Sequence, residues 1–209
     1  AMDNDEYRRG RKTTHIVYGE DMGILAGDAL LNYAFETAFK AFVMEPEESL
    51  LIGRALGVLG EKAGIYGMIG GQVIDVKETG HSIPKEVLDT IYELKTSALI
   101  EASMMIGAIL GGASEEEVKI VEKIARYVGI AFQIQDDILD VTSTKEVLGK
   151  PTHSDEKNEK TTYVTLMGTA EAGRMVEELS DQAVSLLHQL SGENEFLEQL
   201  LLQLIHREK

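Results

Sequence analysis

Apolar residues recur at helical spacing along most of this chain. Between about residues 19 and 43, Leu31, Phe35, Ala38 and Phe42 fall three or four positions apart, which places them on one helix face. Further helices are expected over about residues 48–63, 64–77, 84–110, 115–141, 170–190 and 193–205, with another beginning near residue 161. No stretch alternates in the manner of a strand, so the pattern predicts an all-α fold in a single domain over residues 1–209.

Turn and capping residues mark the ends of these helices. Pro46 and Pro84 suit first helical turns, because the fixed φ of proline fits there and its missing N–H is not needed. Ser114 and Glu117 have the spacing of a capping box. The polar residues 1–18 are predicted to form a loop or a frayed helix end. Residues 142–160 have a loop composition, and we expect either a solvated linker or a lid that closes over bound anions.

Three acidic residues stand together near the end of one apolar helix. Asp136 and Asp140 lie one turn apart on a shared face, and Asp137 lies beside them. Burying three carboxylates among apolar neighbours costs free energy unless cations compensate for their charge. Hard oxygen ligands suit Mg²⁺, which binds through a few carboxylates, water and the phosphates of a substrate. The cluster therefore predicts a Mg²⁺–diphosphate site, with a solvated acidic helix face as the alternative.

The composition narrows the functions open to this fold. With 209 residues, 44% of them hydrophobic, the chain can bury a sizeable core. A net charge of −16 argues against a nucleic-acid backbone as a partner, and the lack of Trp disfavours a base-stacking platform. The chain has no Cys, which excludes disulfides and thiolate sites and indicates a cytoplasmic location. No apolar run is long enough to form a membrane span.

Polar residues also interrupt apolar helices at two other places. Lys95 and Thr96 lie in an apolar stretch, and the lysine is expected either to reach towards solvent or to bind an anion. Gln72 and Asp75 lie on a glycine-rich helix, where Asp75 is either half of a satisfied buried pair or an acid that supports the site. Small residues between positions 23 and 29 indicate close approach of another helix or of a ligand chain.

Taken in order, these motifs resemble those of the trans-isoprenyl diphosphate synthases, such as farnesyl and geranylgeranyl diphosphate synthases. The matching segments are Met2-Asp3-Asn4-Asp5 with Arg8-Arg9-Gly10 and Thr13-Thr14-His15, then Gly27-Asp28-Ala29-Leu30, Gly70-Gly71-Gln72-Val73-Ile74-Asp75, Lys95-Thr96, Phe132-Gln133-Ile134-Gln135-Asp136-Asp137-Ile138-Leu139-Asp140, and Gly149-Lys150-Pro151 with Lys160. Each match is modest alone, but they cover essentially the whole chain. The resemblance implies an isoprenoid-synthase-type helical bundle around a central cavity, with two aspartate-rich motifs facing each other across its mouth.

The resemblance also implies roles for individual residues. The implied Mg²⁺ ligands are Asp3, Asp136, Asp137 and Asp140. The implied catalytic residues, which steady charge near the reacting bond, are Lys95, Thr96, Gln133 and Lys160. The implied diphosphate-binding residues are Arg8, Arg9, Lys95, Lys150 and Lys160, with Arg9 holding isopentenyl diphosphate.

The implied reaction condenses an allylic diphosphate with isopentenyl diphosphate to a short-chain polyprenyl diphosphate. Relatives of this kind form homodimers, so a homodimer or higher homo-oligomer is expected here, with contacts near residues 84–110 and 115–141.

The sequence departs from the family pattern at its start. The Asp pair of the family's first motif would fall just before residue 1, together with preceding helices and a Gly-Lys-Arg segment for isopentenyl diphosphate. We therefore expect an N-terminally truncated bundle that is a weak catalyst in this form. Helix faces would then expose Met, Leu and Ile side chains.

Other functions remain as alternatives. A class I terpene cyclase also has an aspartate-rich helix, but it carries a second metal motif of Asn, Ser or Thr, and Glu. Asn158 falls in a predicted loop and Asn194 begins an ordinary amphipathic helix, so that motif is not seen. A non-catalytic accessory subunit of a prenyl synthase would have degenerate aspartate motifs, whereas the motif ending at Asp140 is intact. A helical packing module with solvated acids is the simplest alternative.

Overall fold

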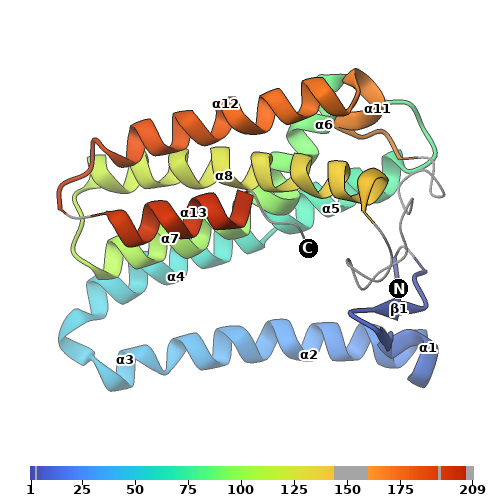
Figure 1. The fold of residues 1–209 in the computed structure, drawn as a ribbon. Helices are drawn as coiled ribbons and strands as arrows, with labels where there is room; N and C mark the ends of the chain where they lie inside the picture. Colours follow the sequence, from blue (N-terminus) through green and yellow to red (C-terminus); the bar gives the residue numbers. More distant parts are fainter. Residues whose placement is uncertain (3, 144–159, 193, 206–209) are drawn as a thin grey trace.

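The computed structural model describes residues 1–2, 4–143, 160–192 and 194–205, and its ribbon is drawn in Figure 1. Nearly all of the regular structure is helical, so the prediction of an all-α fold is confirmed. In chain order the elements are β1 (Tyr7–Arg8), β2 (Arg11–Lys12), α1 (Thr14–Tyr18), α2 (Glu20–Phe39), α3 (Ala41–Met44), a 3₁₀ turn η1 (Pro46–Glu48), α4 (Ser49–Ala63), α5 (Met68–Glu78), α6 (Lys85–Tyr92), a π-turn η2 (Glu93–Ser97), α7 (Ala98–Leu110), α8 (Glu115–Thr142), α11 (Tyr163–Met167), α12 (Thr169–Leu187) and α13 (Glu195–Ile205).

The helix α8 is the centre of the bundle. It packs between α12 on one side and α7 on the other, with α4 beyond α7 and α13 alongside (Figure 1). Ile124, Val128, Ala131 and Ile134 of α8 are fully buried at the three- and four-residue spacing of one helix face. The predicted capping box starts this helix, since the Ser114 hydroxyl accepts from the amide of residue 117 while that residue's carboxylate accepts in return. The core position of α8 follows from this apolar face, and the acidic cluster is carried at its far end.

The first 18 residues contain more structure than the sequence predicted. Tyr7–Arg8 and Arg11–Lys12 pair as a two-residue antiparallel hairpin, followed by α1. Arg9 and Gly10 both have positive φ, 51° and 74°, which is the conformation of a tight hairpin turn. The Thr13 hydroxyl then donates to the carbonyl of Asp5 at 2.8 Å and closes the loop. The expectation of a loop or a frayed helix end missed this hairpin, because a two-residue hairpin needs turn geometry and not strand alternation.

The helix α2 stands apart from the bundle. It begins and ends within the predicted range of residues 19–43, packs mainly on α1 and α3, and has no buried residue (Figure 1). Its Ile24 and Leu30 are 62% and 71% exposed, as expected for an apolar helix face without a partner. Within the described ranges, no helix has both the length and the apolar character needed to cross a bilayer.

A π-turn interrupts the single helix that the sequence predicts over residues 84–110. The turn Glu93–Ser97 lies between α6 and α7 and brings its backbone very close to two glycines. A Cβ atom on Gly71 of α5 would lie 2.3 Å from the backbone nitrogen of Lys95, and one on Gly129 of α8 would lie 2.6 Å from the Cα of Ser97. The Ser97 hydroxyl donates to the carbonyl of Tyr92, which helps the π-turn to satisfy its backbone. Lys95 and Thr96 therefore sit on a turn fixed from two sides.

A buried ion network supports the same turn from behind. Glu101 of α7 is almost fully buried and accepts from both Lys62 of α4 and Arg126 of α8. Arg126 also pairs with Glu93 of the π-turn at 3.0 Å, and Lys62 pairs with Glu122. Burial opposes the charge on Lys62, but the hydrogen bonds that Lys62 donates to the carboxylates of Glu101 and Glu122 outweigh it, so the pKa of Lys62 lies above its ordinary value. The network ties α4, the π-turn, α7 and α8 into one body.

The close approach at Gly129 gives a stability prediction. Gly129→Ala should lower the free energy of unfolding by about 1–3 kcal/mol, because the added methyl group overpacks the contact with Ser97. Gly107→Ala, in open space on α7, is the matched control and should raise it by up to about 1 kcal/mol, since Ala is the better helix former. Urea unfolding followed by circular dichroism measures both, and equal effects of the two substitutions would contradict the close approach.

Candidate functional site

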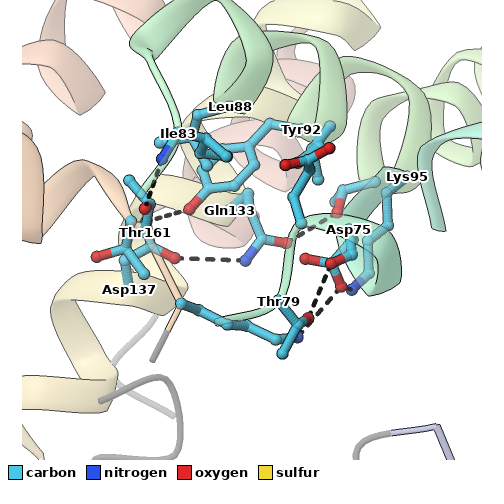
Figure 2. Close-up of a pocket in the computed structure, with 14 residues that line it drawn as sticks. Asp75, Thr79, Ile83, Leu88, Tyr92, Lys95, Gln133, Asp137 and Thr161 are labelled. Atoms are coloured by element: carbon cyan, nitrogen blue, oxygen red, sulfur yellow. Dashed lines mark hydrogen bonds and ion pairs between the residues drawn. The ribbon is translucent and has the colours of Figure 1, made fainter. Parts of the chain in front are cut away.

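A small polar cavity lies where α5, α6, the π-turn, α8 and the segment before α11 meet. Its volume is about 60 Å³, and Figure 2 shows the residues around it. The lining residues are Asp75, Glu78, Thr79, Ile83, Leu88, Ile91, Tyr92, Lys95, Thr96, Gln133, Asp137, Lys160, Thr161 and Thr162. Its lining combines apolar side chains, such as Leu88 and Ile91 of α6, with charged and polar ones, so the cavity can hold charge beside groups that exclude water.

Two lysines meet at one carboxylate in this cavity. The Nζ of Lys95, from the π-turn, lies 2.6 Å from Asp75 Oδ2, and the Nζ of Lys160 lies 3.1 Å from the same oxygen. Asp75 is on α5, so the π-turn presents Lys95 directly to the helix against which Gly71 allows it to pack. Asp75 and Lys160 are largely buried and Lys95 is 32% exposed, and this partial burial strengthens their attraction relative to a solvent-exposed pair.

A hydrogen-bonded chain forms another part of the cavity wall. Thr96 Oγ1 donates to Gln133 Oε1 at 2.8 Å, and Gln133 Nε2 donates to Asp137 Oδ1 at 3.5 Å (Figure 2). The second oxygen of Asp137 accepts from the Tyr92 hydroxyl at 2.5 Å and from the backbone N–H of Tyr163 at 3.2 Å. Asp137 is only 3% exposed, so these donors replace the water that its charge loses on burial. They also fix the orientation of Gln133.

The start of α11 is anchored to α8 and to α6. The Tyr163 hydroxyl donates to Asp89 of α6, and Lys85 pairs with that carboxylate at 2.8 Å and lies 5.2 Å from the centre of the Tyr163 ring. The rings of Tyr92 and Tyr163 pack 5.4 Å apart. Burial, followed by the hydrogen bond to Asp89, raises the pKa of Tyr163 above its usual range, so it stays protonated as a donor.

The three predicted Mg²⁺ ligands of α8 occupy different environments. Asp137 points into the hydrogen-bonded wall, Asp140 is 2% exposed and Asp136 is half-buried on the face shared with Asp140. In the part of the chain that the structure describes, no three acidic or histidine side chains converge to hold a metal ion. Mg²⁺ commonly takes one or two carboxylates and completes its shell with water and substrate phosphate, so Asp136 and Asp140 fit a partial ligand set of this kind.

The structure brings together five of the predicted site residues and leaves others apart. Lys95, Thr96, Gln133, Asp137 and Lys160 all line the cavity. The predicted diphosphate-binding residues Arg8 and Arg9 are exposed in the N-terminal hairpin and are not among the lining residues. The predictions for Asp3 and Lys150, and most of the expected lid over residues 142–160, fall outside the described residues.

The sequence did not indicate two tyrosines that contact the site. Tyr92 precedes Thr96 by four positions, and this spacing could have indicated a shared face with the predicted site residues. Tyr163 enters through its backbone N–H and through Asp89, and no motif in the sequence signals such contacts.

The charges around the cavity limit what it can bind. Its lining includes the two lysines and the three carboxylates of Asp75, Glu78 and Asp137, a net charge of −1. A free anion would meet this negative balance and an existing ion pair at each lysine. An anion that arrives with divalent cations avoids both costs, because the cations offset the carboxylates.

Comparison with known proteins gives consistent findings. A sequence profile described as polyprenyl synthetase matches residues 1–195. The large subunit 1 of a heterodimeric geranylgeranyl pyrophosphate synthase from Arabidopsis thaliana is 42% identical over 186 residues, which are 88% of this chain and 50% of that protein. A dimethylallyltranstransferase from Fischerella ambigua is 46% identical over 184 residues, 88% of this chain and 53% of that protein. The chain thus spans about half the length of the curated relatives it matches.

A solved structure of a related kind also matches the chain. A geranyltransferase from Helicobacter pylori, complexed with magnesium and isoprenyl diphosphate, matches with a TM-score of 0.84 and 34% identity. The match covers 97% of this chain and 65% of that one. The predicted isoprenoid-synthase-type bundle is therefore confirmed.

The buried hydrogen bond between Tyr92 and Asp137 gives a second prediction. Tyr92→Phe should lower the free energy of unfolding by about 1–3 kcal/mol, because the buried carboxylate loses a donor. Tyr66→Phe is the matched control, since Tyr66 is 77% exposed, and should change it by less than about 0.5 kcal/mol. Thermal unfolding of both variants provides the measurement, and a Tyr92→Phe variant as stable as the control would rule out a supporting role for this bond.

Proposed function

We propose that this chain, which belongs to the polyprenyl synthetase family, takes part in the condensation of an allylic diphosphate with isopentenyl diphosphate to a short-chain polyprenyl diphosphate. The observation that carries the proposal is the meeting of Lys95 and Lys160 in a cavity also lined by Thr96, Gln133 and Asp137. Cations and neutral donors gathered beside acids fit a diphosphate that is bound together with divalent metal ions.

The proposal assigns the metal to the acidic face of α8. Asp136 and Asp140, on one helix face, would hold Mg²⁺, with Asp137 beside them fixed by its hydrogen bonds. Asp3 stays a predicted further ligand. When bound, Mg²⁺ supplies positive charge that stabilises the leaving diphosphate.

The residues of the cavity have separate roles in the proposed reaction. Lys95 and Lys160 bind the diphosphate oxygens and stabilise the negative charge that grows as the allylic C–O bond breaks. The electron pair of that bond leaves with the diphosphate, and an allylic cation remains. Thr96 and Gln133, joined by a hydrogen bond, orient the bound diphosphate. Lys150 stays a predicted additional diphosphate ligand.

The new carbon–carbon bond forms when the double bond of isopentenyl diphosphate attacks this cation. Loss of a proton to the departed diphosphate then restores a double bond. Arg8 and Arg9 are the predicted ligands of the substrates on this side of the reaction. The apolar side chains of α6 that line the cavity keep water from quenching the cation.

The proposal extends to assembly and location. A homo-oligomer stays the expected state. Because α8 lies at the centre of the bundle, it has little free surface for a subunit contact. The exposed apolar side chains of α2 are the better candidates for that contact. A cytoplasmic location stays a prediction from the lack of Cys, although several relatives are named as chloroplastic proteins. Size-exclusion chromatography with light scattering would report the oligomeric state.

A binding experiment tests the function directly. The chain should bind inorganic diphosphate by isothermal titration calorimetry when Mg²⁺ is present, and EDTA should abolish that binding. Lys95→Ala should weaken it at least about tenfold, because a charged hydrogen bond to the anion is lost. Lys119→Ala, an exposed lysine of α8, is the matched control and should leave the affinity unchanged.

A product assay completes the test. Incubation with an allylic diphosphate, isopentenyl diphosphate and Mg²⁺, followed by chromatography of the products, should give longer prenyl diphosphates. A chain that shows no Mg²⁺-dependent diphosphate binding would disprove the proposed site. Binding without elongation, together with co-purification of a full-length homologue, would favour the accessory-subunit alternative.

A further inference from the structure

One carboxylate forms ion pairs with both lysines of the cavity. Asp75 Oδ2 accepts from Lys95 at 2.6 Å and from Lys160 at 3.1 Å, although the two lysines come from segments 65 positions apart in the sequence. Asp75 is not on the acidic face of α8, and the proposed reaction gives it no step. It lies on α5, directly opposite the π-turn (Figure 2).

The shared ion pair sets a cost for any anion that enters. An anion that binds either lysine must share it with, or displace, a carboxylate that is already in contact and partly desolvated. It must also approach the remaining negative charges of Asp75, Glu78 and Asp137. A monophosphate or sulfate offers the lysines little more than Asp75 offers, so the exchange gains almost nothing.

A diphosphate bound with divalent cations can compensate for both kinds of charge in the cavity. It brings several oxygens, enough to contact both lysines at once, and its cations offset the carboxylates around the cavity. Only an anion of this kind gains enough to displace Asp75 from both partners.

We propose that Asp75 is a specificity-determining residue that reserves Lys95 and Lys160 for a metal-bound diphosphate and excludes single phosphate groups and metal-free anions. The inference rests on the proposed function of the same cavity, and it adds a residue whose role is to weaken the binding of competing anions. Asp75 would give specificity by weakening the binding of competing anions, and not by strengthening the binding of the metal-bound diphosphate.

The variant Asp75→Asn tests this role because it removes the charge and keeps the size of the side chain. By isothermal titration calorimetry, inorganic phosphate and metal-free inorganic diphosphate should both bind the variant at least about tenfold more tightly than they bind the wild type. The affinity for diphosphate with Mg²⁺ should change less, so the preference for the metal-bound form should shrink.

Glu78→Gln is the matched control, since Glu78 is also a carboxylate lining the cavity but no lysine contact is described for it. It removes the same charge and should alter the metal-free affinities by less than about threefold, the effect of a more distant charge. Equal tightening in the two variants would mean that general charge, and not the shared ion pair, sets the specificity. No tightening in Asp75→Asn would overturn the proposal.

A measurement on the wild type keeps the proposal testable if Asp75→Asn does not fold. The side-chain nitrogen resonances of Lys95 and Lys160, followed by NMR, should move on addition of diphosphate with Mg²⁺ and stay in place on addition of millimolar inorganic phosphate. Movement with both ligands would contradict the selection. A wild type that fails to bind Mg²⁺ and diphosphate together would instead disprove the proposed function, so the two failures are distinguishable.

Discussion

The close packing of one π-turn against two glycines determines where the polar groups of the site lie. In a continuous α-helix over residues 84–110, Lys95 and Thr96 would be rotated away from their observed positions, because a π-turn inserts an extra residue into the helical repeat. Gly71 and Gly129 allow the turn to contact α5 and α8 at distances that any side chain would prevent. One side of the turn thereby presents Lys95 to Asp75, and the other presents Thr96 to Gln133.

Two carboxylates, the partly buried Asp75 and the buried Asp137, connect that turn to the rest of the bundle. Asp75 pairs with lysines from the π-turn and from the segment before α11. Asp137 accepts hydrogen bonds from α6, α8 and the first residue of α11. Each buried charge is stabilised by groups from several elements, so neither helix can shift without leaving a carboxylate poorly solvated. The ion network around Glu101 stabilises the opposite side of the turn in the same way. The site is therefore organised before any ligand binds.

The sequence was informative wherever the chemistry is local. Helical spacing predicted the long helices to within a few residues, and the capping box at Ser114 was confirmed. Lys95 and Thr96, indicated by the family resemblance, line the cavity, and their role stays a prediction. The π-turn was not predicted, because the close contacts that accompany it are with Gly71 and Gly129 on two other helices. The hairpin at residues 7–12 was missed because its strands are too short to alternate. Contacts between distant segments, such as Asp75 with Lys160, leave no periodic trace in the sequence.

The electrostatic balance of the cavity explains why its acids and its lysines belong to one mechanism. A site that binds anions through lysines alone would select any phosphate, since a point charge gives little geometric discrimination. A site lined by carboxylates alone would bind cations and repel the substrate. Placing both kinds of group within hydrogen-bonding distance offsets most of their charge in the ligand-free chain. When a ligand brings its own cations and anions, its anions can pair with the lysines and its cations with the carboxylates. Only a composite ligand, such as a diphosphate with divalent metal ions, can replace Asp75 at both lysines without leaving its carboxylate uncompensated.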